Sequence, residues 1–179
     1  FIRYTENHDI VNDMLRAEVV CGERGAAAVA VINFTLDGVP LLYNGQEIGD
    51  TAPQSIYAPW PVGWAAACLP KPKAKYEFHQ RLCQLRRDEA VLGKGDVIWL
   101  DNDQPQAVVS FLRRSEEMEI LTVANFSNRK ISAGVRLPEK RDAAFKPLLA
   151  GMAKTGTADG GASFEFGPFG YFVGKRSAK

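Results

Sequence analysis

Three polar side chains that can do chemistry follow one another near the start of the chain, as Asn7, His8 and Asp9. They come directly after Phe1–Tyr4, a short apolar segment, and we expect them to mark the exit of a strand, because Asn and Asp are depleted in strand interiors. A carboxylate there can stabilise positive charge, transfer a proton or bind a metal, and the imidazole can donate a hydrogen bond to a hydroxyl group. The same tripeptide also suits an ordinary turn, since Asn and Asp readily bond their own backbone.

The residues that follow alternate between helix and strand patterns. Apolar side chains at helical spacing predict a helix over Glu23–Leu36, which Gly38 would end and Pro40 would keep from continuing. Val39–Tyr43 is short and apolar without alternation, which favours a strand buried on both faces, as in a parallel sheet.

A long loop, Gly49–Pro72, separates that strand from the next helix and carries Trp60 and Trp64. Loops of this length without regular structure are uncommon unless they are functional, and in a βα arrangement they leave the end of a strand where binding sites form. The helix after it is predicted over Lys75–Asp88, with one apolar face made of Phe78, Leu82 and Leu85.

From about residue 90 onward the pattern changes to short strands, and no helix is expected there. Turn signals such as Asp101–Asp103 and Asp159–Gly161 separate the runs, and this spacing predicts an antiparallel sandwich. We therefore expect two domains, residues 1–90 and 91–179. The predicted strands are Val97–Leu100, Ala107–Arg113, Glu119–Asn125, Ile131–Leu137, Phe145–Leu149, Ser163–Phe166 and Tyr171–Gly174.

Composition narrows the function classes further. A formal net charge of +1 gives no reason to expect a nucleic-acid partner, and no apolar run approaches the ~20 residues that a membrane helix needs. Cys21, Cys68 and Cys83 are odd in number and widely spaced, which indicates three free thiols, some of them buried, and neither a disulfide framework nor a zinc site. Unpaired thiols favour a cytoplasmic location for the protein. The chain begins at Phe1, so we expect the natural protein to extend upstream.

Two motifs resemble a known family. Phe1–Asp9 is similar to the strand-seven motif of the α-amylase family (glycoside hydrolase family 13), Phe-x-x-Asn-His-Asp, with Tyr4 at the aromatic position. Gly38–Gly49 is similar to the strand-eight signature of that family, Gly-x-Pro-x-x-Tyr-x-Gly-x-Glu-x-Gly. The two occur in the right order with one predicted helix between them, and a β region follows, so the resemblance extends over the whole chain.

The resemblance implies a mainly β chain: the last two strands and two helices of a (β/α)8 barrel, followed by a C-terminal antiparallel β-sandwich. It also implies a retaining glycosidase acting on α-glucosidic bonds. Asp9 matches the carboxylate that stabilises the transition state, and His8 matches a residue that bonds sugar hydroxyls, with Asn7 beside them as a further substrate-binding residue. Trp60 and Trp64 either stack on sugar rings or pack the loop.

The family's nucleophile and general acid would lie upstream of this chain, as would the ligands of its calcium ion. We therefore expect no metal or cofactor in this chain, although calcium could bind the longer parent, and we expect the isolated chain to be inactive. Its partners would be an α-glucan or maltooligosaccharide substrate and the missing N-terminal barrel segment. The alternatives are a non-catalytic carbohydrate-binding or interaction module and a degenerate scaffold. Bond specificity stays open.

Overall fold

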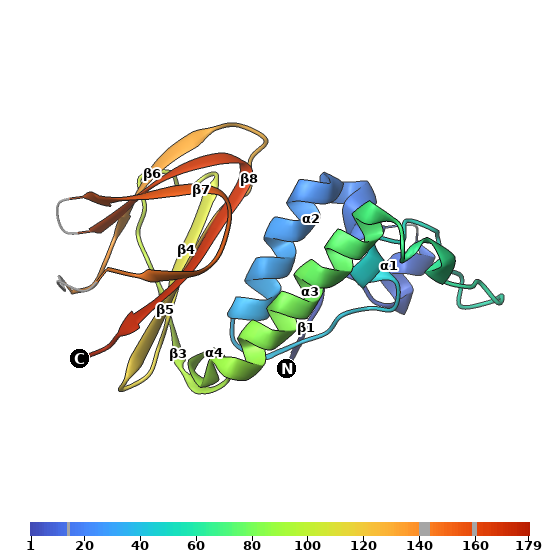
Figure 1. Ribbon diagram of the computed structural model, residues 1–179, viewed down its shortest axis with the longest axis horizontal. Helices are drawn as coiled ribbons and strands as arrows, with labels where there is room; N and C mark the ends of the chain where they lie inside the picture. The colour runs from blue at the N-terminus through green and yellow to red at the C-terminus, as the bar shows by residue number, and fades with distance from the viewer. Residues whose placement is uncertain (14, 140–143, 159–160) are drawn as a thin grey trace. The chain divides into compact units, whose positions relative to one another are not determined.

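The computed structural model describes residues 1–13, 15–139, 144–158 and 161–179. The chain forms two compact units (Figure 1). The first, called here the helical unit, contains residues 1–34 and 38–88, and the second, the β unit, contains residues 35–37 and 89–179.

The helical unit contains a pair of short parallel strands, β1 (Ile2–Arg3) and β2 (Val39–Pro40), with Ile2 opposite Val39. Between them lie helices α1 (His8–Asn12) and α2 (Ala17–Thr35). Gly22 interrupts α2 with a non-helical backbone (φ 69°, ψ 166°), so the regular helix after Gly22 matches the predicted one. Gly38 (φ 81°) follows α2, in agreement with the predicted helix stop.

Strand β2 differs from the expectation of a strand buried on both faces. It is two residues long and does not extend to Tyr43, and the side chain of Val39 is exposed. Within the described residues β2 pairs with β1 alone, so no second neighbouring strand covers its other edge. An apolar sequence without alternation shows that both faces of a strand could be buried. In the described residues no element covers Val39, so its side chain remains exposed.

Helix α3 (Pro70–Asp88) begins five residues before the predicted Lys75, because proline is tolerated in the first helical turn. Leu82 is fully buried, whereas Phe78 and Leu85 are only half-buried. At one end Lys75 pairs with Glu18 of α2 at 2.6 Å. At the other end Arg86 of α3 donates to the carbonyl oxygens of Phe34 and Gly38, so α2 and α3 run parallel (Figure 1). Two single 3-10 turns, η1 (Gln46–Ile48) and η2 (Trp64–Ala66), lie on the connection from β2 to α3.

The β unit begins with a short helix, α4 (Ala90–Lys94), where no helix was expected. Five residues are too few to show a helical period, so this helix leaves no detectable pattern in the sequence. Among the described residues of this unit, six antiparallel strands follow, in the order β3-β4-β5-β8-β6, and β7 pairs with β8. Their bounds are β3 (Asp96–Trp99), β4 (Val108–Arg114), β5 (Met118–Asn125), β6 (Ile131–Arg136), β7 (Lys146–Ala158) and β8 (Gly161–Ser177).

The long strand β8 folds the sheet back on itself. The predicted strands 163–166 and 171–174 are the two halves of this one strand: residues 161–166 pair with β6, and residues 171–177 pair with β5. Strand β7 pairs with both halves and has a register shift between Gly151 and Ala153. Bulges of this kind let strands turn the corner between two layers. The layers enclose a core of Val108, Leu112, Leu121, Val123, Ala133, Val135, Phe164, Phe166 and Phe172.

Outside this core, Trp99 lies on the edge strand β3 and is exposed, with its ring edge-on to that of Phe111.

No helix in the described residues combines the length and the apolarity that crossing a membrane would need.

The corner depends on close backbone packing at Gly170, which gives a first prediction. A Cβ atom at Gly170 would lie 2.5 Å from the carbonyl oxygen of Met152, so the two strands would have to separate. Gly170→Ala should lower the free energy of unfolding by about 1–3 kcal/mol, measured by urea denaturation. Gly93→Ala is the control, because a Cβ atom there meets nothing within 4 Å and helix propensity favours alanine. Equal effects of the two substitutions would contradict the corner packing.

Candidate functional site

The tripeptide at the exit of β1 begins a helix. Asn7 is the N-cap of α1, and its Oδ1 accepts a hydrogen bond of 2.8 Å from the backbone N–H of Ile10. The turn-forming and the functional interpretations of the sequence are thus compatible, because the Asn7 cap orients the two residues that follow. His8 and Asp9 project from the first turn with side chains 63% and 68% exposed, and His8 Nε2 lies 3.4 Å from Asp9 Oδ1. This end of α1 presents a carboxylate and an imidazole to solvent.

The residue just before the tripeptide is buried. Glu6 Oε2 accepts a 2.7 Å hydrogen bond from Arg16 Nη1, and Glu6 Oε1 accepts one of 2.8 Å from the backbone N–H of Ala17. Burial raises the pKa of the Glu6 carboxyl, and the Ala17 N–H and the Arg16 guanidinium act against that rise. The sequence indicated no role for either Glu6 or Arg16, which lie ten residues apart.

Arg16 also reaches the segment that follows β2. Its Nη2 lies 3.3 Å from Asp50 Oδ2, close enough for charge attraction although the N–H is not aimed at the oxygen. The Arg16 side chain is 1% exposed and that of Asp50 is 10% exposed. The guanidinium carbon also lies 6.0 Å from the centre of the Tyr43 ring. One buried cation therefore contacts residues that follow both strands of the parallel pair.

Gln46 makes a second connection between the same two segments. Its Nε2 donates to Thr5 Oγ1 at 2.7 Å, and its Oε1 accepts from the backbone N–H of Tyr43 at 3.2 Å. Gly45 precedes it with φ 88°, and a Cβ atom at Gly45 would lie 2.9 Å from Arg16 Nη2. The Gly45–Gln46 part of the strand-eight signature thus provides backbone geometry and room for Arg16.

The two tryptophans lie on the connection between η1 and α3, residues 49–69, called here the tryptophan loop. Trp60 and Trp64 are both about half exposed, and Tyr57 is more so. The loop is joined to α1 by a 3.3 Å hydrogen bond from the Ile56 N–H to Asn12 Oδ1. Exposed rings suit stacking on an apolar sugar face, and this role stays a prediction.

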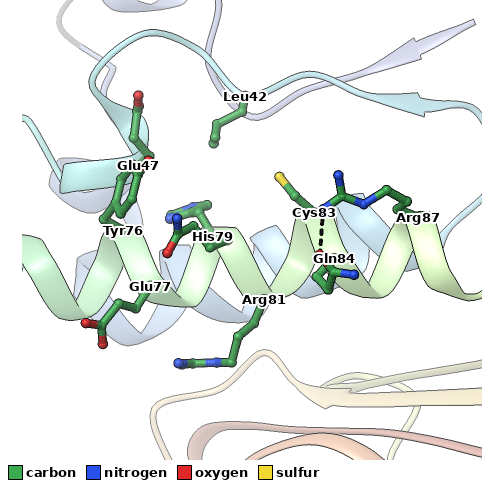
Figure 2. A pocket seen from close by; sticks show the side chains of 10 residues that line it. Leu42, Glu47, Tyr76, Glu77, His79, Arg81, Cys83, Gln84 and Arg87 are labelled. Atoms are coloured by element: carbon green, nitrogen blue, oxygen red, sulfur yellow. Dashed lines mark hydrogen bonds between the residues drawn. The ribbon is translucent and has the colours of Figure 1, made fainter.

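A separate pocket of about 700 Å³ lies along α3, and none of the predicted site residues lines it. Leu42 and Glu47 face it from the segment after β2, and the other lining side chains shown in Figure 2 come from α3. His79 is buried there, with Nδ1 3.0 Å from the carbonyl oxygen of Lys75. Within the described residues Glu47 Oε2 is buried without a hydrogen-bond partner.

The cysteines differ from their expectation. Cys21, Cys68 and Cys83 are free, as the sequence indicated, but all three are exposed and none is a buried apolar group. Cys83 lies at the rim of the α3 pocket, where partial burial raises its thiol pKa. Across the part of the chain that the structure describes, no three His, Cys, Asp or Glu side chains are grouped so as to hold a metal ion.

Comparison with known proteins identifies similar sequences. No family model matches the chain. The chain is 30% identical over 168 residues to α-amylase MalA of Haloarcula japonica, and 24% identical over 138 residues to α-amylase 2 of Dictyoglomus thermophilum. These matches cover 91% and 72% of the chain, respectively, but only 23% of each relative. The chain therefore spans under a quarter of the length of the curated relatives that it matches.

Solved structures share the fold. The structure superposes on that of a noncanonic maltogenic α-amylase, AmyB of Thermotoga neapolitana, with a TM-score of 0.74 and 20% identity, covering 99% of this chain and 41% of that one. An α-amylase of H. orenii gives 0.66 with 18% identity over 98% of this chain and 39% of that one. Together with the sequence relatives, these structures confirm the resemblance to the α-amylase family and the expected fold class.

The burial of His79 gives a second prediction. Burial is the largest influence and lowers its pKa below the ordinary 6.5, against the opposing effects of the Lys75 carbonyl and of Glu47 and Glu18. The folded state therefore favours the neutral imidazole. The stability that depends on this neutral form is complete above pH 6.5 and is lost as the pH falls from 6.5 toward the lowered pKa of His79. The melting temperature should drop between about pH 7 and 5.5, and His79→Asn should reduce that drop.

His8 is the matched control for this experiment, because the chain has two histidines and the side chain of His8 is exposed. His8→Asn should keep the pH dependence of the unsubstituted chain. An unchanged drop in His79→Asn, or a drop removed by His8→Asn instead, would contradict this assignment.

Proposed function

We propose that this chain supplies one wall of the substrate site of an α-glucan-active, retaining glycosidase of the α-amylase type. The observation that carries the proposal is the exposed pair His8 and Asp9, placed by the Asn7 cap at the end of a parallel strand. In an open α/β arrangement ligands bind at the carboxyl ends of parallel strands, which is where this pair lies. The relatives named α-amylases support the substrate class.

In this proposal each side chain has a defined task. The fixed negative charge of Asp9 stabilises the positive charge that develops on the sugar ring as the glycosidic bond breaks. His8 donates a hydrogen bond to a hydroxyl of the same sugar, and Asn7 fixes the turn that carries both. Trp60 and Trp64 supply aromatic faces for neighbouring sugar units.

Bond cleavage needs two further carboxyl groups about 5 Å apart, and we place these on the rest of a longer parent protein. Parallel barrels close with eight strands, and in the described residues β1 and β2 pair only with each other. Phe1, Ile2 and Val39 are exposed apolar side chains on or beside this pair. The partner that we propose is therefore the remaining barrel, and the isolated chain should not hydrolyse glucans.

The test is the activity of the natural protein that contains this chain. Asp9→Asn keeps the size of the side chain but removes the charge, so kcat on maltoheptaose should fall by at least about 100-fold. Asp101→Asn is the control, because its side chain is 87% exposed in the β unit. Activity of Asp9→Asn within a few fold of the natural protein would contradict the proposal, as would turnover by the isolated chain.

A second candidate is a non-catalytic carbohydrate-binding module, which the exposed Tyr57, Trp60 and Trp64 side chains favour. It predicts that maltoheptaose binding depends on the rings and not on Asp9. Replacing Trp60 and Trp64 with Ala should then abolish binding to the isolated chain, and Asp9→Asn should leave it unchanged.

A further inference from the structure

The buried charges Glu6, Arg16 and Asp50, called here the Arg16 clamp, have no task in the chemistry described above. Two of them flank the proposed site in the chain: Glu6 immediately precedes Asn7, and Asp50 is the second residue of the tryptophan loop. Arg16 lies between α1 and α2 and contacts both carboxylates, at 2.7 Å and 3.3 Å.

We propose that Glu6, Arg16 and Asp50 are positioning residues that hold the Asn7–Asp9 segment and the start of the tryptophan loop in one fixed arrangement. The inference rests on the proposed function, since it assigns these two segments to a glucan site. A positioning residue need not touch the sugar. It fixes the groups that do, because small displacements of those groups reduce binding and rate.

The burial of the clamp makes its geometry specific. A buried guanidinium needs nearby carboxylates to offset its lost hydration, and Glu6 and Asp50 supply these at 2.7 Å and 3.3 Å. Displacing either segment would leave a buried charge without its partner, which is strongly unfavourable. The clamp therefore resists relative movement of the two segments more strongly than apolar packing would.

Each carboxylate also accepts a hydrogen bond from a backbone N–H group, for Glu6 at the start of α2 and for Asp50 within its own segment. Glu6 Oε1 accepts the Ala17 N–H at the start of α2, and Asp50 Oδ1 accepts the Ala52 N–H at 3.0 Å. The Asp50 N–H donates to the Gly45 carbonyl oxygen at 2.9 Å. Arg16 thus joins two carboxylates that are each fixed locally, and its planar fork can contact both at once.

The test compares Arg16→Lys with Arg24→Lys, the same change at an exposed arginine of α2. A lysine keeps the charge but presents one compact ammonium in place of the fork. Amide hydrogen exchange of the purified chain should become faster in Arg16→Lys in both segments, residues 5–13 and 43–54, and should stay unchanged in Arg24→Lys. Exchange that is unchanged, or faster only next to residue 16, would overturn the proposal.

Binding of maltoheptaose to the same variants, followed by NMR, separates positioning from general stability. In Arg16→Lys the affinity should fall about tenfold, the loss of one charged hydrogen bond, while the melting temperature stays within a few degrees of the unsubstituted chain. Glu6→Gln serves where Arg16→Lys does not fold, because it keeps the side-chain size and an acceptor for Ala17. Undiminished affinity in these variants would overturn the proposal.

The glucan site and the Arg16 clamp are tested by different measurements. If the unsubstituted chain shows no maltoheptaose-induced shifts at Asn7–Asp9, the assignment of the glucan site to this chain fails. The exchange comparison still decides whether the clamp holds the two segments together.

Discussion

The guanidinium of Arg16 is almost completely removed from water, and this burial constrains the helical unit around it. The charge is stable in the interior because Glu6 and Asp50 lie against it, and these residues come from the segments that follow the two parallel strands. Gly45 must be a glycine both for its positive φ and for the space that Arg16 occupies. A two-stranded sheet of four residues could not set this arrangement by hydrogen bonding alone.

The positions of the exposed His8 and Asp9 side chains depend on these buried charged residues. The side chains of His8 and Asp9 are exposed, so their placement depends on the two residues before them, the Asn7 cap and the buried Glu6. The tryptophan loop depends on the same constraint through Asp50, and on the hydrogen bond between Ile56 and Asn12. A carboxylate stabilises a developing positive charge best when its position is fixed in advance.

The sequence predicted those features that leave a local pattern. The helix after Gly22, its stop at Gly38 and most strands of the β unit follow from hydrophobic period and turn residues, and two motifs identified the family resemblance. The sequence could not show the Arg16 clamp, because residues 6, 16 and 50 come together only through the fold. It also missed the single strand β8, since Gly167 and Gly170 look like a turn but lie within one bent strand.

The burial of individual residues was predicted less well, for a related reason. Apolar character says that a residue gains from burial, but not that a neighbouring element is there to cover it. Val39 and the three cysteines are exposed for this reason, whereas His79, a polar residue on a partly charged helix, is buried. Such cases depend on which segments pack together, and a local pattern in the sequence does not contain that information.

A crystal structure of this chain soaked with maltoheptaose would show directly whether residues 7–9 bind the sugar. We expect a sugar ring within hydrogen-bond distance of His8 and Asp9, with Glu6, Arg16 and Asp50 unmoved. A maltoheptaose bound only to the β unit, or bound in the helical unit without contact to residues 7–9, would contradict this expectation.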